Sequence, residues 1–229
     1  LNQPNVTFVR REGDNTVWRL APGTYHLTVN IDPSRGKDKQ GIVEEQFLYI
    51  NAPFPQAHSV SIAETPKGDL VATYFGGTKE RNPDVCIWVS RKPKGATEWE
   101  APVQVADGII SATERKACWN PVLLQIPGKK GELLLFYKVG KSVADWKAYI
   151  LRSKDGGKSW SKPEAMPDGF LGPSKNKPEY VDGRIICPSS TEGNGWKIHF
   201  EISDDNGHTW RKVGPVEAEL SVPTQFRKK

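Results

Sequence analysis

Three side chains in this sequence are suited to proton transfer or nucleophilic attack: Asp84, Glu192 and His58. Hydrolysis of a glycosidic bond usually needs two carboxyl groups, one that protonates the leaving oxygen and one that acts as nucleophile or base. Imidazole can serve as a base because its charge changes near neutral pH. We therefore treat these three residues as catalytic candidates. The competing interpretations are a turn cap for Asp84, a solvated loop residue for Glu192 and a satisfied core histidine for His58.

Other side chains could bind a sugar. Lys138, Lys175 and Lys177 could hold the carboxylate of an acidic sugar, although a lysine ammonium is less directional than the fork of an arginine. Trp119 could stack against a sugar ring, and its competing interpretation is a core position. Solvated surface is the competing interpretation for Lys175 and Lys177. The residues that could bind hydroxyl groups are Asn120, Asn176 and Ser189.

A repeated motif indicates which elements position these residues. The pattern S-x-D-x-G-x-x-W, called an Asp box, occurs at residues 153–160 and 203–210. A degenerate copy from Ser90 to Trp99 keeps the serine, Gly95 and the tryptophan but lacks the aspartate. Asp and Ser accept hydrogen bonds from turn amides, Gly supplies a positive φ, and Trp buries its ring between sheets. We therefore interpret the box as a structural hairpin, and expect Trp99, Trp160 and Trp210 to occupy equivalent places in successive sheets.

A second marker recurs in step with the first. A glycine turn precedes an apolar run at residues 68–70, 131–133 and 183–185. Each unit therefore consists of four antiparallel strands, which is the blade of a β-propeller. We predict an all-β chain in which residues 51–229 form the propeller region, with blades at about 54–107, 119–168 and 175–217. Because a propeller closes its ring, three clear blades indicate a partial propeller.

Residues 1–50 contain four further strand-like stretches, at 5–10, 16–20, 24–31 and 41–50, but no Asp box. They could form a divergent blade or a separate N-terminal β segment.

Antiparallel connectivity sorts the loops between the two ends of the blades. Glycine turns and Asp-box turns fall at one end, whereas the loops between second and third strands and between blades fall at the other. The candidate residues belong to this second end, and loops on a rigid scaffold are where sites are commonly built. We expect Asp84 to point into a central cleft, where burial would raise its pKa and suit it to act as a general acid.

Composition narrows the choice of partners. The net charge of +5 is spread along the chain, without the basic block of a nucleic-acid arm, and mildly favours an acidic ligand. No apolar run reaches the length of a membrane span. Cys86, Cys118 and Cys187 lack metal-binding spacing, and we expect them to be buried thiols. The sequence predicts no metal and no cofactor.

The stretch from Phe54 to Pro215 resembles bacterial sialidase-like proteins with BNR repeats, in particular the predicted neuraminidases. The supporting stretches are 54–58 (FPQAH), 75–78 (FGGT), 82–84 (NPD), 119–121 (WNP), 136–140 (FYKVG), 171–173 (LGP), 175–178 (KNKP) and 187–192 (CPSSTE). The resemblance implies a six-bladed propeller, secreted or periplasmic, that hydrolyses glycosidic bonds without a cofactor and uses Asp84 as its acid/base. This sequence departs from the family's three arginines, because Gln56, Ala57 and His58 stand where the first is expected and no arginine lies near Phe75.

The sequence therefore favours an exo-acting, sialidase-like glycoside hydrolase that acts on a glycan with an acidic terminal sugar. Two alternatives stay open. One is another carbohydrate-active propeller, a uronate lyase or a non-sialic glycosidase, that uses His58 and the lysines. The other is a non-catalytic glycan-binding propeller.

Overall fold

The computed structural model describes residues 6–12, 15–20, 46–128, 130–191 and 197–216. The chain divides into two compact units, Leu1–Gln46 and Phe47–Lys229. In the first unit, β1 (Val6–Glu12) and β2 (Asn15–Leu20) form an antiparallel pair. These two strands coincide with two of the four stretches expected in residues 1–50. The stretch at 24–31 and half of that at 41–50 lie outside the described residues.

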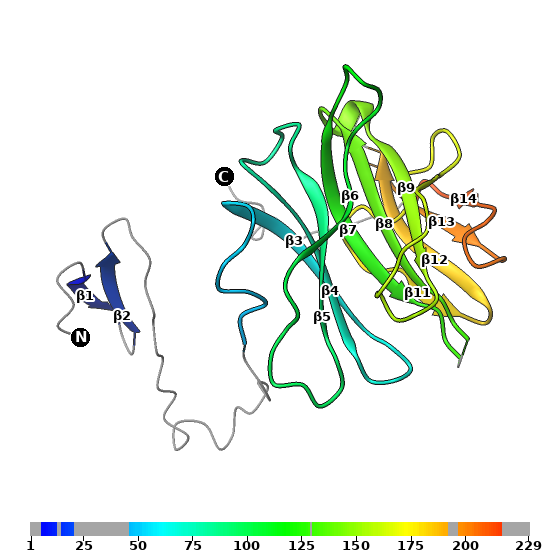
Figure 1. The fold of residues 1–229 in the computed structure, drawn as a ribbon. Helices are drawn as coiled ribbons and strands as arrows, with labels where there is room; N and C mark the ends of the chain where they lie inside the picture. The colour runs from blue at the N-terminus through cyan, green and yellow to red at the C-terminus, as the bar shows by residue number, and fades with distance from the viewer. Residues whose placement is uncertain (1–5, 13–14, 21–45, 129, 192–196, 217–229) are drawn as a thin grey trace, which may run out of the picture. The chain divides into compact units, whose positions relative to one another are not determined.

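The described residues of the second unit form three four-stranded antiparallel sheets, each in sequence order (Figure 1). Blade 1 comprises β3 (Gln56–Glu64), β4 (Leu70–Gly77), β5 (Cys86–Lys92) and β6 (Val103–Ala106). Blade 2 comprises β7 (Ala117–Gln125), β8 (Leu133–Gly140), β9 (Lys147–Ser153) and β10 (Glu164–Ala165), with the 3-10 helix η1 (Val143–Asp145) between β8 and β9. Blade 3 comprises β11 (Glu179–Val181), β12 (Arg184–Thr191), β13 (Lys197–Ser203) and β14 (Arg211–Val213). The predicted all-β, partial-propeller fold is confirmed.

Blade 2 lies between the other two, and β8 shows why its sequence is apolar without interruption. All eight residues of β8 are buried. Because successive side chains of a strand point to opposite faces, Leu135 and Tyr137 join the core shared with blade 1. Leu134 and Phe136 join the core shared with blade 3. A strand that is buried on both faces therefore needs apolar residues at nearly every position.

The three Asp-box tryptophans occupy equivalent positions, as predicted. The residue after each tryptophan pairs with the third strand of its own blade: Glu100 N donates to Arg91 O at 2.7 Å, and Ser161 N donates to Arg152 O at 2.8 Å. In blade 3, Arg211 lies opposite Ile202.

The alignment of the degenerate copy on Ser90 is wrong by two residues. Lys92 lies opposite Leu70, as Ser153 lies opposite Leu133 and Ser203 opposite Ile185. Lys92 thus occupies the position of the motif serine, and Lys94 and Ala96 occupy those of the aspartate and the glycine. Ser90 instead bonds the Tyr74 hydroxyl, with the two oxygens 2.8 Å apart. The strand pairing fixes which positions are equivalent, whereas the sequence alignment matched Ser90 to the motif serine by residue type alone.

The two complete Asp boxes share one hydrogen-bond pattern. Asp155 Oδ1 accepts from the amides of Lys158 and Ser159 at 3.0 and 2.9 Å, and Ser153 Oγ accepts from Gly157 N at 2.7 Å. Burial raises the pKa of Asp155, but hydrogen bonds from the hydroxyl and amide of Ser159 and from Ser153 outweigh it and lower the pKa to about 2. The carboxylates of the two boxes are therefore structural anions, as the sequence indicated.

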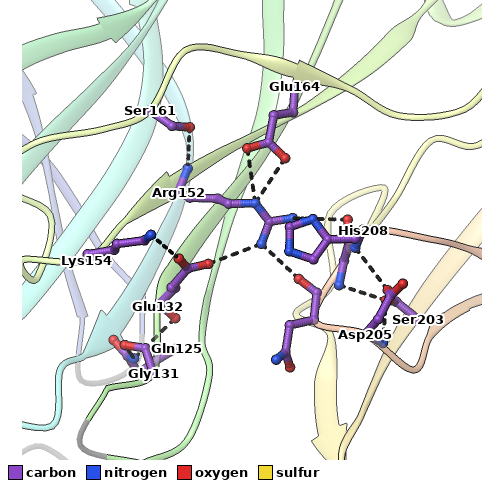
Figure 2. A network of polar contacts seen from close by, with 12 residues as sticks. Gln125, Gly131, Glu132, Arg152, Lys154, Ser161, Glu164, Ser203, Asp205 and His208 are labelled. Carbon is purple, nitrogen blue, oxygen red and sulfur yellow. Dashed lines mark hydrogen bonds and ion pairs between the residues drawn. The ribbon is translucent and has the colours of Figure 1, made fainter.

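A buried arginine, Arg152, joins blade 2 to the Asp box of blade 3 (Figure 2). Arg152 bonds Glu132 at 3.2 Å and Glu164 at 3.0 Å within blade 2. Its guanidinium also donates to the carbonyl oxygens of Asn206 at 2.9 Å and Gly207 at 3.1 Å, in the Asp-box turn of blade 3.

Arg91 repeats this arrangement one blade earlier. It pairs with Asp69 at 3.1 Å and Glu100 at 3.2 Å, and its Nε donates to Gly156 O at 2.9 Å. We call Arg91 and Arg152 the interblade arginines.

Replacing Arg152 with leucine should destabilise the protein by about 3 kcal/mol, because two carboxylates and two turn carbonyls lose their partner. The measurement is the free energy of unfolding from urea denaturation. The control is Arg184→Leu, whose side chain is 55% exposed and pairs with the equally exposed Asp204. That change should cost roughly 0.5 kcal/mol or less. Equal losses for the two variants would contradict a special role for the buried guanidinium.

Candidate functional site

The loops sort between the two ends of the blades as the connectivity predicts. We call the end formed by residues 78–85, 107–116, 141–146 and 166–178 the loop-bearing end. The loop between β12 and β13 belongs to the same end, but residues 192–196 lie outside the described residues. Glu192 is therefore not placed, and its catalytic role stays a prediction.

The inner strands of blades 1 and 2 meet at two matching bulges near this end. Pairing shifts between His58 and Ser61 in β3 and between Trp119 and Val122 in β7. Ser59 and Asn120 occupy these bulges with φ values of 55° and 39°, and Ser59 Oγ donates to Asn120 Oδ1 at 3.1 Å. Bulges re-aim side chains next to sites. The predicted hydroxyl-binding residue Asn120 thus lies at the junction of two inner strands.

His58 is exposed, so its interpretation as a core histidine is wrong. Its ring stacks on Phe75, with centroids 5.5 Å apart and planes inclined by 28°. The stack leaves the imidazole available to solvent at the start of the inner strand, where a base or a sugar-binding group could act.

Asp84 is half-buried and accepts hydrogen bonds through Oδ2 from both the amide and the hydroxyl of Thr78, the amide at 2.8 Å. The Thr78 hydroxyl has the largest influence and lowers the pKa of Asp84, and the Thr78 amide and the charge of Arg115 also lower it. The expectation of a raised pKa is therefore wrong for this structure, because hydrogen bonds to the charged form outweigh the partial burial. Asp84 is an ionised carboxylate that also closes the 78–84 loop.

Arg115 is an exposed cation at this end that sequence reasoning did not single out. It lies in the loop between blades 1 and 2, and its guanidinium donates to Cys86 Sγ at 2.9 Å. The positive charge thus lies beside the Asp84 carboxylate. The three cysteines are free and buried, as expected.

Lys138 does not face solvent. It is fully buried, and its ammonium group donates to the carbonyl oxygens of Pro173 and Ser174, the latter at 3.3 Å. The prediction that Lys138 contacts a sugar carboxylate is therefore wrong in this structure. Lys138 projects from the face of β8 that meets blade 3, so its ammonium group binds the loop between blades 2 and 3 and not a ligand.

Glu201 in β13 holds the same loop from the other side. Its carboxylate is fully buried and accepts from Leu171 N at 3.1 Å and Gly172 N at 2.6 Å. His199 Nε2 lies 3.0 Å from Glu201 Oε1. A buried carboxylate is tolerated only when it is hydrogen-bonded in this way. Lys138 and Glu201 together fix both the carbonyls and the amides of residues 171–174, which we call the clamped loop.

The clamped loop leads into the predicted binding residues 175–177. Lys175 and Asn176 are exposed. Lys177 is also exposed, and its ammonium group donates to the carbonyl oxygen of Ile62 in β3, so this segment spans from blade 3 to the inner strand of blade 1.

Two other predicted binding residues are buried. Trp119 is only 6% exposed, donates through Nε1 to Gly140 O at 2.7 Å and packs against the rings of Phe75 and Trp146. The predicted sugar platform is therefore wrong, and Trp119 is a core residue. Ser189 is 3% exposed, and its hydroxyl has no hydrogen-bond partner among the described residues.

Glu201 and His199 were missed because β13 reverses the usual pattern. Its apolar residues Ile198 and Phe200 are exposed, whereas His199, Glu201 and Ser203 face blade 2. Alternating polar and apolar residues do not show which face of a strand is buried. The buried polar residues of β13 can be recognised only when the blade packed against that strand is known.

Four grooves found on the described surface lie between blades or at the Asp-box end. None of the four is lined by Asp84, His58 or Lys138. We therefore place the candidate site by its chemistry rather than by the size of a cavity. The described residues contain no group of three or more His, Cys, Asp or Glu side chains that could hold a metal ion. They also contain no helix with the length and apolar character needed to span a membrane.

Comparison with known proteins places the chain among propellers. The family described as "BNR repeat-like domain" matches residues 68–228. No curated protein matches the sequence.

Three solved structures share the fold at low identity. The Hadza microbial sialidase Hz136 is 17% identical with a TM-score of 0.58 over 70% of this chain, and a Dyadobacter fermentans protein of unknown function is 20% identical with a TM-score of 0.54 over 72%. The NanB sialidase of Streptococcus pneumoniae is 11% identical with a TM-score of 0.51 over 73%. This chain spans only 38%, 56% and 45% of those three chains, respectively.

Amide exchange in the clamped loop tests whether the buried charge of Glu201 holds this loop in place. Glu201→Gln should weaken two charge-assisted hydrogen bonds and speed hydrogen–deuterium exchange of the Leu171 and Gly172 amides about 10- to 100-fold, equivalent to roughly 1.5–3 kcal/mol. The control is Glu179→Gln, an exposed position on β11 of the same blade. Unchanged exchange in Glu201→Gln would show that the loop is held by its apolar contacts alone.

Proposed function

Because this chain belongs to the family of BNR repeat-like domains, we propose that it forms part of an exo-acting glycoside hydrolase that acts on extracellular or periplasmic glycans with an acidic terminal sugar. The observation that carries the proposal is the grouping at the loop-bearing end. There the exposed His58, the bulge residue Asn120 and the ionised Asp84 belong to two adjacent blades.

Charge at this end supports an acidic ligand. Arg115 and Lys175 are exposed cations of the loop-bearing end, whereas the ammonium group of Lys177 is bonded to Ile62 O. Arg115 presents a planar fork that suits a carboxylate, whereas Lys175 acts as a point charge. They take the place that the sequence analysis gave to Lys138, which is committed to the clamped loop.

Asp84 enters the proposed reaction as a base. A carboxyl group with a lowered pKa is ionised at neutral pH and can take a proton from an attacking water. Hydrolysis also needs a proton donor for the leaving oxygen. We assign that role to Glu192, which the sequence predicts at the same end.

A second candidate function is a glycan-binding propeller without catalysis. One observation favours it: Thr78 donates two hydrogen bonds to Asp84, as expected of a carboxylate whose task is to cap a turn. The two candidates share the ligand and differ only in whether the bond is cleaved.

The test uses Asp84→Asn, which keeps the shape and removes the base. Activity should fall about 10²–10⁴-fold. The loss should be similar on an aryl glycoside of an acidic sugar and on an oligosaccharide that ends in the same sugar, because a base is needed with either leaving group. A loss confined to the oligosaccharide would identify Asp84 as the acid instead. A uniform small loss with a lowered melting temperature would mark a turn cap, and product that absorbs as an unsaturated sugar would indicate a lyase.

Thr78→Val is the matched variant for the pH profile. It removes the hydroxyl that lowers the pKa of Asp84, so that pKa rises. A base is active only when ionised, and activity is lost as the pH falls through its pKa. The acidic limb of kcat/KM should therefore move to higher pH in Thr78→Val, and an unmoved limb would exclude Asp84 as the base.

A further inference from the structure

The interface between blades 1 and 2 contains an open groove beside the outermost strand β6. One part, of about 410 Å³, lies between residues 100–105 of blade 1 and the Asp-box residues 157–160 of blade 2. A second part, of about 340 Å³, shares Gln104 and Val105 with the first and continues past residues 106–110. The two parts together, which we call the β6 groove, extend from the Asp-box end toward the loop-bearing end.

Aromatic rings line the blade 2 side of the β6 groove. Trp160 lines the first part and is half-buried. Tyr149 lines the second part and stacks on the buried Tyr137, with ring centroids 5.5 Å apart. Partly exposed aromatic rings offer flat apolar surface together with polar edges.

The polar groups of the β6 groove are balanced in charge. Two cations, Arg91 and Lys158, and two anions, Glu100 and Asp107, line it. Arg91 and Glu100 neutralise each other at 3.2 Å. The amide of Gln104, which can donate and accept, lies where the two parts meet. A neutral ligand with many hydroxyl groups fits this lining better than an ion does.

The motif tryptophan of the interface between blades 2 and 3 also packs against a core cluster, as Trp160 does, but none of the four grooves is lined by Trp210. There Met166 and Phe170, from the loop after β10, belong to the same core cluster as Trp210. Trp210 also contacts Phe136 at 6.0 Å and donates through Nε1 to Gly207 O at 3.1 Å.

The indole Nε1 of Trp160 is buried and has no hydrogen-bond partner among the described residues. An unsatisfied buried donor is unfavourable by about 1–3 kcal/mol. The same motif tryptophan is thus satisfied in one interface and unsatisfied in the other, and the unsatisfied one lines the groove.

We propose that the β6 groove binds the neutral part of a glycan chain, at a site that neither of the catalytic candidates Asp84 and His58 lines. Sugar rings would stack on Trp160 and Tyr149 through their apolar faces, and their hydroxyls would bond Gln104, Glu100 and Lys158. The site does not depend on hydrolysis, so it holds whether or not the protein is a hydrolase.

The test is isothermal titration of the full chain with four neutral hexasaccharides: cellohexaose, xylohexaose, mannohexaose and chitohexaose. At least one should bind, and Trp160→Phe should weaken it about tenfold, which corresponds to roughly 1.4 kcal/mol. The matched control is Trp210→Phe, the same motif position in the interface between blades 2 and 3, which lines none of the four grooves and should leave binding unchanged. Melting temperatures of both variants report whether either substitution disturbs the fold.

Three outcomes would overturn the proposal. One is that no hexasaccharide binds at millimolar concentration. Another is that Trp160→Phe and Trp210→Phe weaken binding equally, which would mean that the tryptophan acts through stability. The third is binding of an extended peptide of alternating valine and threonine but no hexasaccharide, which would identify the free edge of β6 as a strand-addition site.

Discussion

The packing of one blade on the next depends on a buried guanidinium that donates hydrogen bonds to the next blade. Arg91 and Arg152 each satisfy carboxylates of their own blade and then donate to carbonyl oxygens of the following Asp-box turn. A buried cation needs several acceptors, and neither blade alone provides enough of them. The Asp box thus shapes a turn whose outward carbonyls complete the preceding blade. In blade 3, Ile202 stands at the corresponding place of β13, in register with Ile186 as Arg152 is with Leu134.

A second set of buried charges acts at the opposite end of the sheets. Lys138 and Glu201 are both fully buried, and each binds backbone groups of the clamped loop. Blades 2 and 3 are therefore joined by polar groups at both ends of a shared apolar core. The Asp-box end joins them through turn carbonyls, whereas the loop-bearing end joins them through a loop that continues into exposed cations. Both ends therefore join the blades, but the loop-bearing end also presents charged side chains to solvent.

The candidate site shows why residue type is a poor guide to role. Lys138, Trp119 and Asp84 were selected because lysine, tryptophan and aspartate can bind or react with sugars. Two of the three are buried, and the third is ionised by its neighbours. Lys138 projects from its strand into the loop between blades 2 and 3, and Asp84 accepts hydrogen bonds from Thr78 of its own loop. Asn120 kept its predicted place, because a bulge in an inner strand re-aims residues toward the end of the sheet.

The sequence by itself determined the blades. The Asp boxes, the glycine turns and the apolar runs are local patterns, and hydrogen bonds within a hairpin follow from local residues. It also placed the tryptophans, since each follows its own turn by a fixed count. Only the tertiary structure decided the inward faces of Lys138 and Glu201. Those depend on which blade lies against which face, and contacts between residues far apart in the chain leave no periodic trace in the sequence.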